Sequence, residues 1–250
     1  MTTPFKIHFT WKNNDIPPKF VNIINKWREL HPNYEIHYYT DDDIDKYIDK
    51  FPQFKTSFNN MLVKIEQVDF FRYLILYNEG GVYSDLDVLP LKKIDDFVIL
   101  NKIIIATEPI EHAKRNNIDI MYCNALMISP PKQIFWLKLC EYITDNYEFS
   151  KGPVKNTGPI ALTNFINTNN NFNIEKINPC IFMPLTSRGI SKECNIENSY
   201  TIHLWNNSWV KPWYKDERFS YYGNIIGKSL NSIFLLYILF ILIIIIFLTH

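Results

Sequence analysis

Two aspartates, Asp85 and Asp87, are separated by a single residue. They follow a run that predicts a β-strand, and Leu89 and Pro90 after them predict a break into a loop. Open α/β sheets bind ligands at the carboxyl ends of their strands, so both carboxylates can reach one site if the chain bends there. Carboxylates suit Mg²⁺ or Mn²⁺ and leave coordination positions for diphosphate oxygens. Alone the pair is a weak signal, because solvated acidic pairs are common.

A second charged pair, Asp69 and Arg72, lies upstream. The surrounding pattern predicts a long helix over residues 59–79, stopped by a left-handed turn at Gly80 and Gly81. Because the two charged residues are one turn apart, their side chains share a face. The structural interpretation is an i,i+3 ion pair that contributes only about 0.2–0.5 kcal/mol. The functional interpretation is that both side chains face a ligand.

The elements that position these residues alternate between strand and helix. Apolar runs predict strands over residues 5–10, 34–39, 82–84, 99–106, 125–129 and 200–205. Helical spacing and end signals predict helices over residues 19–30, 41–50, 59–79 and 132–146. The Asn-rich residues 167–173 predict a surface loop. The alternation predicts the α/β class, with a mostly parallel sheet flanked by helices.

Composition excludes several classes of protein. Hydrophobic residues make up 47% of the chain, which excludes a disordered protein. The 26 basic residues are balanced by 26 acidic residues, so the chain lacks the excess positive charge of nucleic-acid-binding proteins. The four cysteines contain no C-x-x-C pair, so zinc-ligand spacing and a disulfide-dense scaffold are both excluded. We expect reduced, scattered thiols.

The carboxyl end of the chain has a different composition. Residues 230–249 carry no charged side chain and are long enough to span a bilayer core of about 30 Å as a helix. A buried core helix or a removable lipid-anchor signal are the alternatives. The basic residues before this span are Lys211, Lys215, Arg218 and Lys228, and His250 alone follows it. No amino-terminal signal sequence is visible, so we expect a single-pass carboxyl-terminal anchor with a cytosolic catalytic domain.

The block from Asp69 to Asp87 reads DFFRYLILYNEGGVYSDLD and resembles the signature of glycosyltransferase family 32, which carries the DXD sugar-binding motif. The family is related to yeast-type initiating mannosyltransferases and to the large clostridial glucosylating toxins. Further stretches resemble the family in the same order, at residues 7–12, 16–20, 27–32, 157–159 and 203–209. The resemblance implies a GT-A-type domain over residues 1–222, followed by a linker at 223–229 and the transmembrane helix at 230–249.

The resemblance also implies roles in metal binding and catalysis. Asp87 is expected to ligate Mn²⁺ or Mg²⁺ directly, and Asp85 to contact the ribose and reach the metal through water. Both are the expected catalytic residues. His203 is a candidate additional ligand of the metal or the diphosphate, although a lone histidine is more often structural.

Donor-binding roles follow in the same way. The resemblance places Asp69 and Arg72 against the sugar and ribose of the donor. Trp11 would stack on the nucleobase or else be a core residue, and Tyr83 would border the ribose or else pack inside the sheet. Asn124 would face the sugar. Ser208 and Trp209 would belong to a mobile loop that closes over the diphosphate.

The predicted function is a metal-dependent, retaining glycosyltransferase. It would move a hexose from a nucleotide-diphosphate sugar to a glycan, glycolipid or protein acceptor, and the lipid bilayer would hold it through the carboxyl-terminal helix. Retention can proceed through a covalent intermediate or by front-face attack, and we favour the second. A nucleotide-sugar hydrolase and a noncatalytic, membrane-held nucleotide-sugar-binding module are the alternatives.

Overall fold

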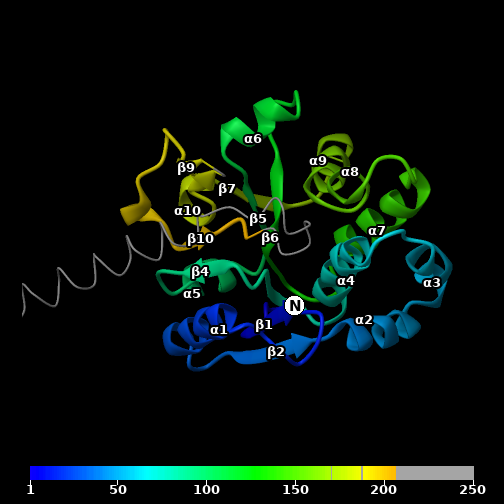
Figure 1. The fold of residues 1–250 in the computed structure, drawn as a ribbon, viewed down its shortest axis with the longest axis horizontal. Coiled ribbons are helices and arrows are strands. Elements are labelled where there is room, and N and C mark those ends of the chain that lie inside the picture. The colour runs from blue at the N-terminus through cyan, green and yellow to red at the C-terminus, as the bar shows by residue number, and fades with distance from the viewer. Residues whose placement is uncertain (170, 187, 207–250) are drawn as a thin grey trace, which may run out of the picture. The chain divides into compact units, whose positions relative to one another are not determined.

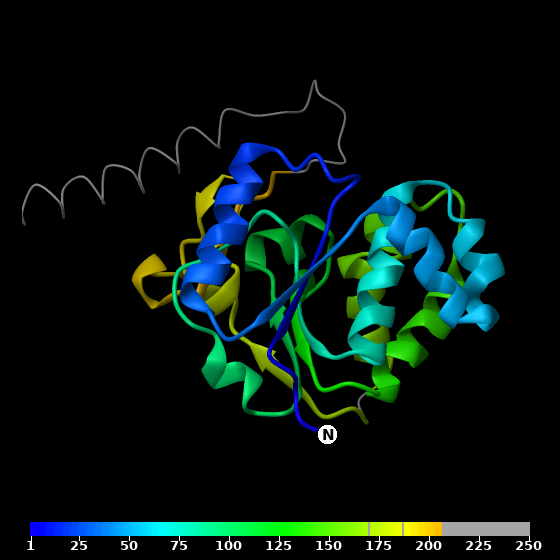
Figure 2. The same ribbon diagram turned by 90° about the horizontal axis from the view of Figure 1, so that it is seen from below.

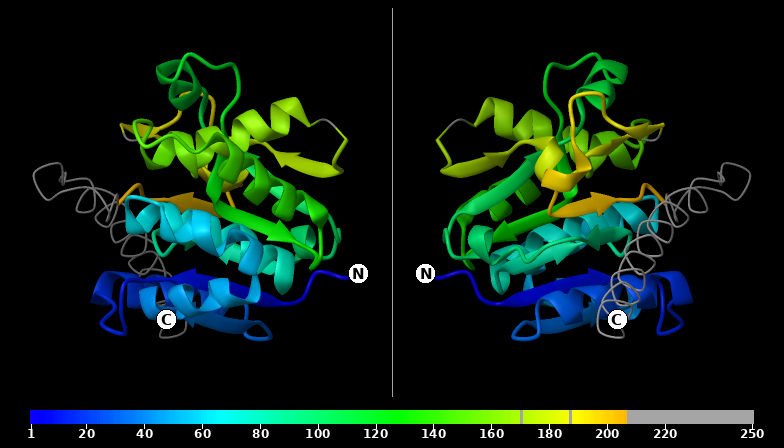
Figure 3. Two further views of the ribbon diagram at one scale, coloured as in Figure 1. Left: turned by 90° about the vertical axis from the view of Figure 1, so that its right-hand side faces the viewer. Right: turned by 90° about the vertical axis from the view of Figure 1, so that its left-hand side faces the viewer.

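The computed structural model describes residues 1–206 apart from residues 170 and 187, and its centre is a six-stranded sheet (Figure 1). The strands in spatial order are β2 (Glu35–Tyr39), β1 (Lys6–Thr10), β3 (Gly81–Ser84), β6 (Tyr122–Ser129), β5 (Ile103–Thr107) and β7 (Ile174–Ile177). In this sheet β6 runs opposite to the other five strands, so the sheet is mostly parallel, as predicted. Figure 3 shows β1 and β2 at one edge and β7 toward the other.

Helices cover both faces of the sheet (Figure 2). One face carries α1 (Pro18–Leu30), α5 (Asp95–Val98) and α10 (Pro179–Phe182). The other carries α2 (Asp41–Tyr47), α3 (Pro52–Asn59), α4 (Lys64–Asn78), α7 (Ile134–Asn146), α8 (Pro153–Asn156) and α9 (Pro159–Thr168). A further short helix, α6 (Ile110–Arg115), follows β5. The predicted α/β class is therefore confirmed.

Side chains of each central strand enter two separate hydrophobic cores. Along β5, Ile103 and Ile105 pack with α4, α7 and α9, whereas Ile104 packs with α1 and α10. Successive residues of a strand point to opposite faces, so a strand covered on both sides must be apolar throughout. This two-sided burial holds the strand ends, where the charged residues lie, in fixed positions.

Two short strands outside the main sheet differ from the prediction. Val88–Pro90 forms β4 and pairs antiparallel with β10 (Thr201–His203), so the predicted loop at Leu89 and Pro90 is wrong. Proline is tolerated at this position because the two-stranded ladder has edges where no backbone donor is required. A second ladder joins β8 (Leu185–Thr186) to β9 (Gly189–Ile190).

The predicted helix over residues 59–79 starts later than expected. Residues 52–59 form α3, and Phe54 and Phe58 at its inner face pack edge-on against Phe70 of α4. The predicted stop is confirmed, since Gly80 and Gly81 have φ values of +67° and +91°. Other element boundaries also differ from the prediction. The predicted helix over residues 41–50 ends in the 3₁₀ turn η1 (Ile48–Lys50), and the predicted strand at 99–106 begins at Ile103. Residues 167–168 end α9 rather than starting a loop.

The expectation of reduced thiols is wrong for two of the four cysteines. Cys180 in α10 and Cys194, which precedes the 3₁₀ turn η2 (Ile196–Asn198), form a disulfide with their Cα atoms 4.9 Å apart. The fold brings them together because the intervening residues turn back through the β8–β9 hairpin. Cys123 and Cys140 are buried free thiols, as predicted.

Within the described residues no helix has the length and apolar character needed to cross a bilayer. The predicted linker at 223–229 and the predicted transmembrane helix at 230–249 lie outside the described residues.

Candidate active site

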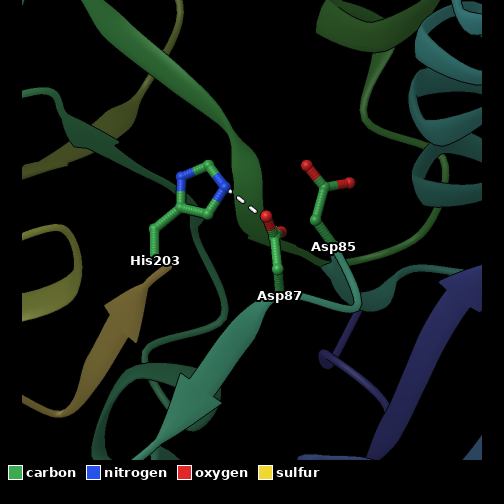
Figure 4. A group of neighbouring side chains, drawn as sticks. All are labelled: Asp85, Asp87 and His203. Atoms are coloured by element: carbon green, nitrogen blue, oxygen red, sulfur yellow. Dashed lines mark ion pairs between the residues drawn. The ribbon is translucent and has the colours of Figure 1, made fainter. Parts of the chain in front are cut away.

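Asp85, Asp87 and His203 converge at the carboxyl-terminal side of β3 (Figure 4). The chain turns after Ser84, so that both aspartates leave the strand on the same side, and β4 begins directly after Asp87. The β4–β10 ladder pairs His203 with Val88, and the Leu204 amide donates to the Asp87 carbonyl at 2.9 Å. One ligand atom from each of the three side chains lies within 4.8 Å of the others.

The electrostatics of this cluster favour a positive charge between the side chains. His203 Nε2 lies 3.2 Å from Asp87 Oδ1. Burial disfavours the imidazolium, but the Asp87 carboxylate outweighs it and holds the pKa of His203 well above its usual range. Burial raises the pKa of Asp85, Arg72 opposes this shift, and the neighbouring Asp87 adds to it. A divalent cation could therefore take the place of the proton on His203.

Arg72 lies behind the acidic cluster with only 3% of its side chain exposed. Its guanidinium donates to Asp69 Oδ1 at 2.9 Å and to the Asn124 carbonyl at 2.7 Å, and it lies 3.3 Å from Asp85 Oδ1. The Tyr83 ring lies 4.6 Å from the guanidinium carbon. Burial opposes the charge, but Asp85 and Asp69 outweigh it and raise the pKa of Arg72. Asp69 and Arg72 therefore form the i,i+3 ion pair of the structural interpretation, and the pair is buried.

Asp69 is held on both of its oxygens by the protein. Oδ1 accepts from the Asn124 side chain at 3.0 Å as well as from Arg72, and Oδ2 accepts from the Thr157 hydroxyl at 2.9 Å. Burial raises the pKa of Asp69 to about 6, against the opposing effect of Arg72. Tyr73 also joins this network, because its hydroxyl accepts from the Asn124 amide and donates to the Thr157 carbonyl.

Tyr83 is fully buried, and its hydroxyl donates to Asp85 Oδ1 at 3.0 Å. The predicted packing interpretation is confirmed for this ring, and the hydroxyl also orients a site carboxylate. Trp11 is half-buried at the end of β1, with its ring 4.9 Å from that of Phe20 and its indole N–H donating to the Asp15 carbonyl. It offers a rigid aromatic surface at the rim of the sheet.

The structure thus brings most of the predicted site residues together. Direct contacts join Asp69, Arg72, Tyr83, Asp85 and Asn124, and an ion pair joins Asp87 to His203. The two groups meet where ligand atoms of Asp85, Asp87 and His203 lie within 4.8 Å of one another. Trp11 lies on the neighbouring strand, and Ser208 and Trp209 lie outside the described residues. Sequence reasoning gave no role to Thr157 or Tyr73. Thr157 could have been found, because residues 157–159 are one of the stretches that resemble the family. Tyr73 had no such signal beyond its position one residue after Arg72.

Comparison with known proteins assigns one part of the chain, residues 17–108, to a family. Residues 17–108 match the family described as "Glycosyltransferase sugar-binding region containing DXD motif". Residues 17–108 carry this glycosyltransferase sugar-binding region. The match includes Asp69, Arg72, Asp85 and Asp87, and the predicted family resemblance is confirmed.

Two curated relatives are fungal proteins. Inositol phosphoceramide mannosyltransferase 3 of Schizosaccharomyces pombe is 43% identical over 86 residues, which are 34% of this chain and 24% of that protein. Mannosyl phosphorylinositol ceramide synthase SUR1 of Saccharomyces cerevisiae is 32% identical over 165 residues, which are 64% of this chain and 41% of that protein. The chain therefore spans less than half the length of either relative.

A solved structure shares the fold. The PaToxG glycosyltransferase superimposes with a TM-score of 0.51 at 17% sequence identity, covering 66% of this chain and 69% of that chain. At this level of identity the similarity concerns the fold alone. It agrees with the predicted glycosyltransferase-like α/β architecture.

Proposed function

We propose that the chain is a divalent-metal-dependent glycosyltransferase. It moves a hexose from a nucleoside diphosphate sugar to a glycolipid acceptor and retains the anomeric configuration. The observation that carries this proposal is the convergence of Asp85, Asp87 and His203 beside the buried Arg72, with both aspartates inside the matched sugar-binding region. Because both fungal relatives are named for mannosyl groups on phosphoinositol ceramide, a mannosyl donor and an inositol-phosphate lipid are the first pair to test.

The three side chains fit a divalent cation. Two carboxylates and one imidazole form a mixed oxygen and nitrogen set that suits Mn²⁺, with Mg²⁺ as the harder alternative. In the proposed complex Asp87 and His203 are direct ligands, and Asp85 reaches the metal through water. When bound, the cation would neutralise the negative charge that grows on the leaving diphosphate.

The remaining residues orient the donor in this proposal. Trp11 stacks on the nucleobase, whereas the buried Arg72 holds Asp85, which contacts the ribose, in place with its planar donor fork. Asp69, fixed by Thr157 and Asn124, keeps the guanidinium in that orientation. In front-face attack an oxygen of the donor phosphate accepts the proton of the acceptor hydroxyl. Catalysis then depends mainly on positioning and on electrostatic stabilisation of the leaving group.

A donor screen with the purified full-length chain tests this function. Nucleoside diphosphate release is measured from a panel of GDP- and UDP-sugars, with and without Mn²⁺. We expect Mn²⁺-dependent release from one donor, lost in Asp87→Asn and kept in Asp96→Asn, which makes the same change at an exposed position of α5. No release from any donor would contradict the enzymatic proposal. Donor binding without release would then indicate the noncatalytic binding module.

A further inference from the structure

The proposed ligand His203 is oriented in an unusual way. Metal-binding histidines almost always donate the second ring N–H to a carboxylate, a carbonyl or water, which fixes the ring. Here the second nitrogen, Nδ1, is buried and has no nitrogen or oxygen partner among the described residues. The group beside it is the thiol of Cys123, which is only a weak acceptor. Another contact must therefore fix the imidazole plane.

The ring of Trp205 makes that contact. Its centroid lies 4.0 Å from the centroid of the His203 imidazole, and the two planes are inclined by 37°. A tilted stack at this distance restricts rotation of the imidazole about its bond to Cβ. The contact leaves Nε2 of His203 directed toward Asp87, as Figure 4 shows.

Trp205 is itself held by three further features. Its backbone has a φ of +51°, a conformation that a residue other than glycine keeps only where its surroundings enforce it. Its indole N–H donates to the Leu185 carbonyl at 2.7 Å. The His112 ring also meets the indole edge-to-face at 4.6 Å, and Nδ1 of His112 donates to the buried Glu108 carboxylate at 2.7 Å.

We propose that Trp205 is a positioning residue for the metal ligand His203, and that it fixes the imidazole by ring stacking in place of the usual hydrogen bond. Glu108 and His112 support the indole. This inference rests on the proposed metal site. It assigns a role to a buried acid–imidazole pair that the proposed reaction does not otherwise use.

This role can be tested without turnover by measuring Mn²⁺ binding to the full-length chain. The electron paramagnetic resonance signal of free Mn²⁺ reports how much of the metal is bound. Trp205→Leu and Trp205→Met both remove the ring, so failure of one variant to fold leaves the other. We expect each to weaken Mn²⁺ binding about tenfold, as for loss of other groups that orient a ligand. Trp205→Phe keeps a ring and should bind within about threefold of the wild type.

The controls separate positioning from folding and from the metal site itself. Thermal unfolding midpoints identify variants that are merely unstable. Trp136 of α7 is a buried tryptophan in the other core, and its indole N–H donates to the Ser129 hydroxyl. Trp136→Phe removes this hydrogen bond and should bind Mn²⁺ as the wild type does. Folded Leu and Met variants with wild-type affinity would overturn the inference, as would a Phe variant as weak as Leu. Absence of wild-type Mn²⁺ binding, or binding that persists in Asp87→Asn, would instead overturn the proposed metal site.

Discussion

Arg72 is shared by three acceptors: the carboxylates of Asp69 and Asp85 and the carbonyl of Asn124. Because the Asp69–Arg72 pair is buried, removing the cation leaves an uncompensated carboxylate in the interior. We expect Arg72→Leu to lower the free energy of unfolding by about 3 kcal/mol, measured by denaturant titration. The double variant Asp69→Leu/Arg72→Leu should recover part of this loss. A single variant as stable as the wild type would contradict the account of a buried pair.

His8 supplies a pH-dependent contribution to stability. It is fully buried, and burial lowers its pKa from 6.5 to about 4, although the Gly80 carbonyl opposes the shift. The unfolded chain therefore binds a proton first as the pH falls. The free energy of unfolding should fall between pH 6.5 and pH 4, by up to about 3 kcal/mol from this group.

His8→Gln is the matched variant, since it keeps a donor for the Gly80 carbonyl but does not titrate. The comparison is the difference between the two unfolding curves over this pH range. Identical pH dependence in both proteins would show that His8 does not carry the effect. Other groups, such as Asp69 with its raised pKa, shift both curves alike.

At the residue scale, types and spacing indicated the two charged pairs, whereas Tyr83, Asn124 and His203 were predicted from the family resemblance. The shared face of Asp69 and Arg72 follows from helical geometry, and the convergence of Asp85 and Asp87 follows from a bend after a strand. The partners of these groups could not be predicted. Thr157 reaches Asp69 because α8, which it follows directly, packs against α4, and this packing is not visible in the sequence.

The turn between α4 and β3 positions the start of β3, the strand that leads to Asp85. Gly80 has a φ of +67°, and a Cβ there would lie 2.5 Å from the Pro131 nitrogen and 2.8 Å from the Ser129 carbonyl oxygen. Gly152 has nearly the same φ, +69°, but no atom within 4 Å of the Cβ position. With a ψ of 172° it lies in a region that almost only glycine adopts, so we expect Gly152→Ala to cost about 1–3 kcal/mol from backbone strain alone.

Gly80→Ala combines backbone strain at positive φ with the steric clash against residues 129–131, so it should cost more than Gly152→Ala, about 3 kcal/mol or above. Thermal unfolding of the two variants side by side measures the difference. Equal losses would mean that the close approach of residues 129–131 relaxes without cost.

The segment that leads to β10 is closed by the Cys180–Cys194 disulfide. Alkylation in denaturant, followed by mass spectrometry, should modify two cysteines before reduction (Cys123 and Cys140) and four after it. Replacing both bonded cysteines by serine should lower stability by about 3 kcal/mol, because the crosslink closes a loop with a sequence separation of 14. Four modified cysteines without reduction would contradict the bond.

Disulfide bonds persist in oxidising compartments, which disagrees with the cytosolic location expected from the charge distribution.

At the element scale, the sequence predicted α1, α2, α4, α7 and six of the strands, but it missed α3, α9 and most of the short helices. The helices α5, α6, α8 and α10 are too short to show a helical period, and β4 contains a proline that argued against a strand. The register of β4 against β10 is a tertiary property. It is this register, rather than any motif, that brings His203 to Asp87.

At the scale of the whole molecule, the fold explains why one edge of the sheet can hold a reactive donor. Both faces of the sheet are buried under helices, so β1, β3 and β6 are rigid, and their adjoining residues supply Trp11, Asp85 and Asn124. Asp85, Asp87 and His203 lie at or beside strand ends, whereas the Asp69–Arg72 pair is buried in α4. This arrangement suits a reaction whose catalysis is mainly orientation of a bound substrate.

Transfer of a labelled hexose is the measurement that tests the central claim most directly. The full-length chain is given the donor found in the screen, Mn²⁺ and a phosphoinositol ceramide, and the lipid fraction is separated from free sugar. The account predicts label in the lipid, absent without Mn²⁺ and in Asp87→Asn, and present in Asp96→Asn. Label that appears only as free hexose would indicate a nucleotide-sugar hydrolase, and Mn²⁺-independent transfer would contradict the proposed role of Asp85, Asp87 and His203.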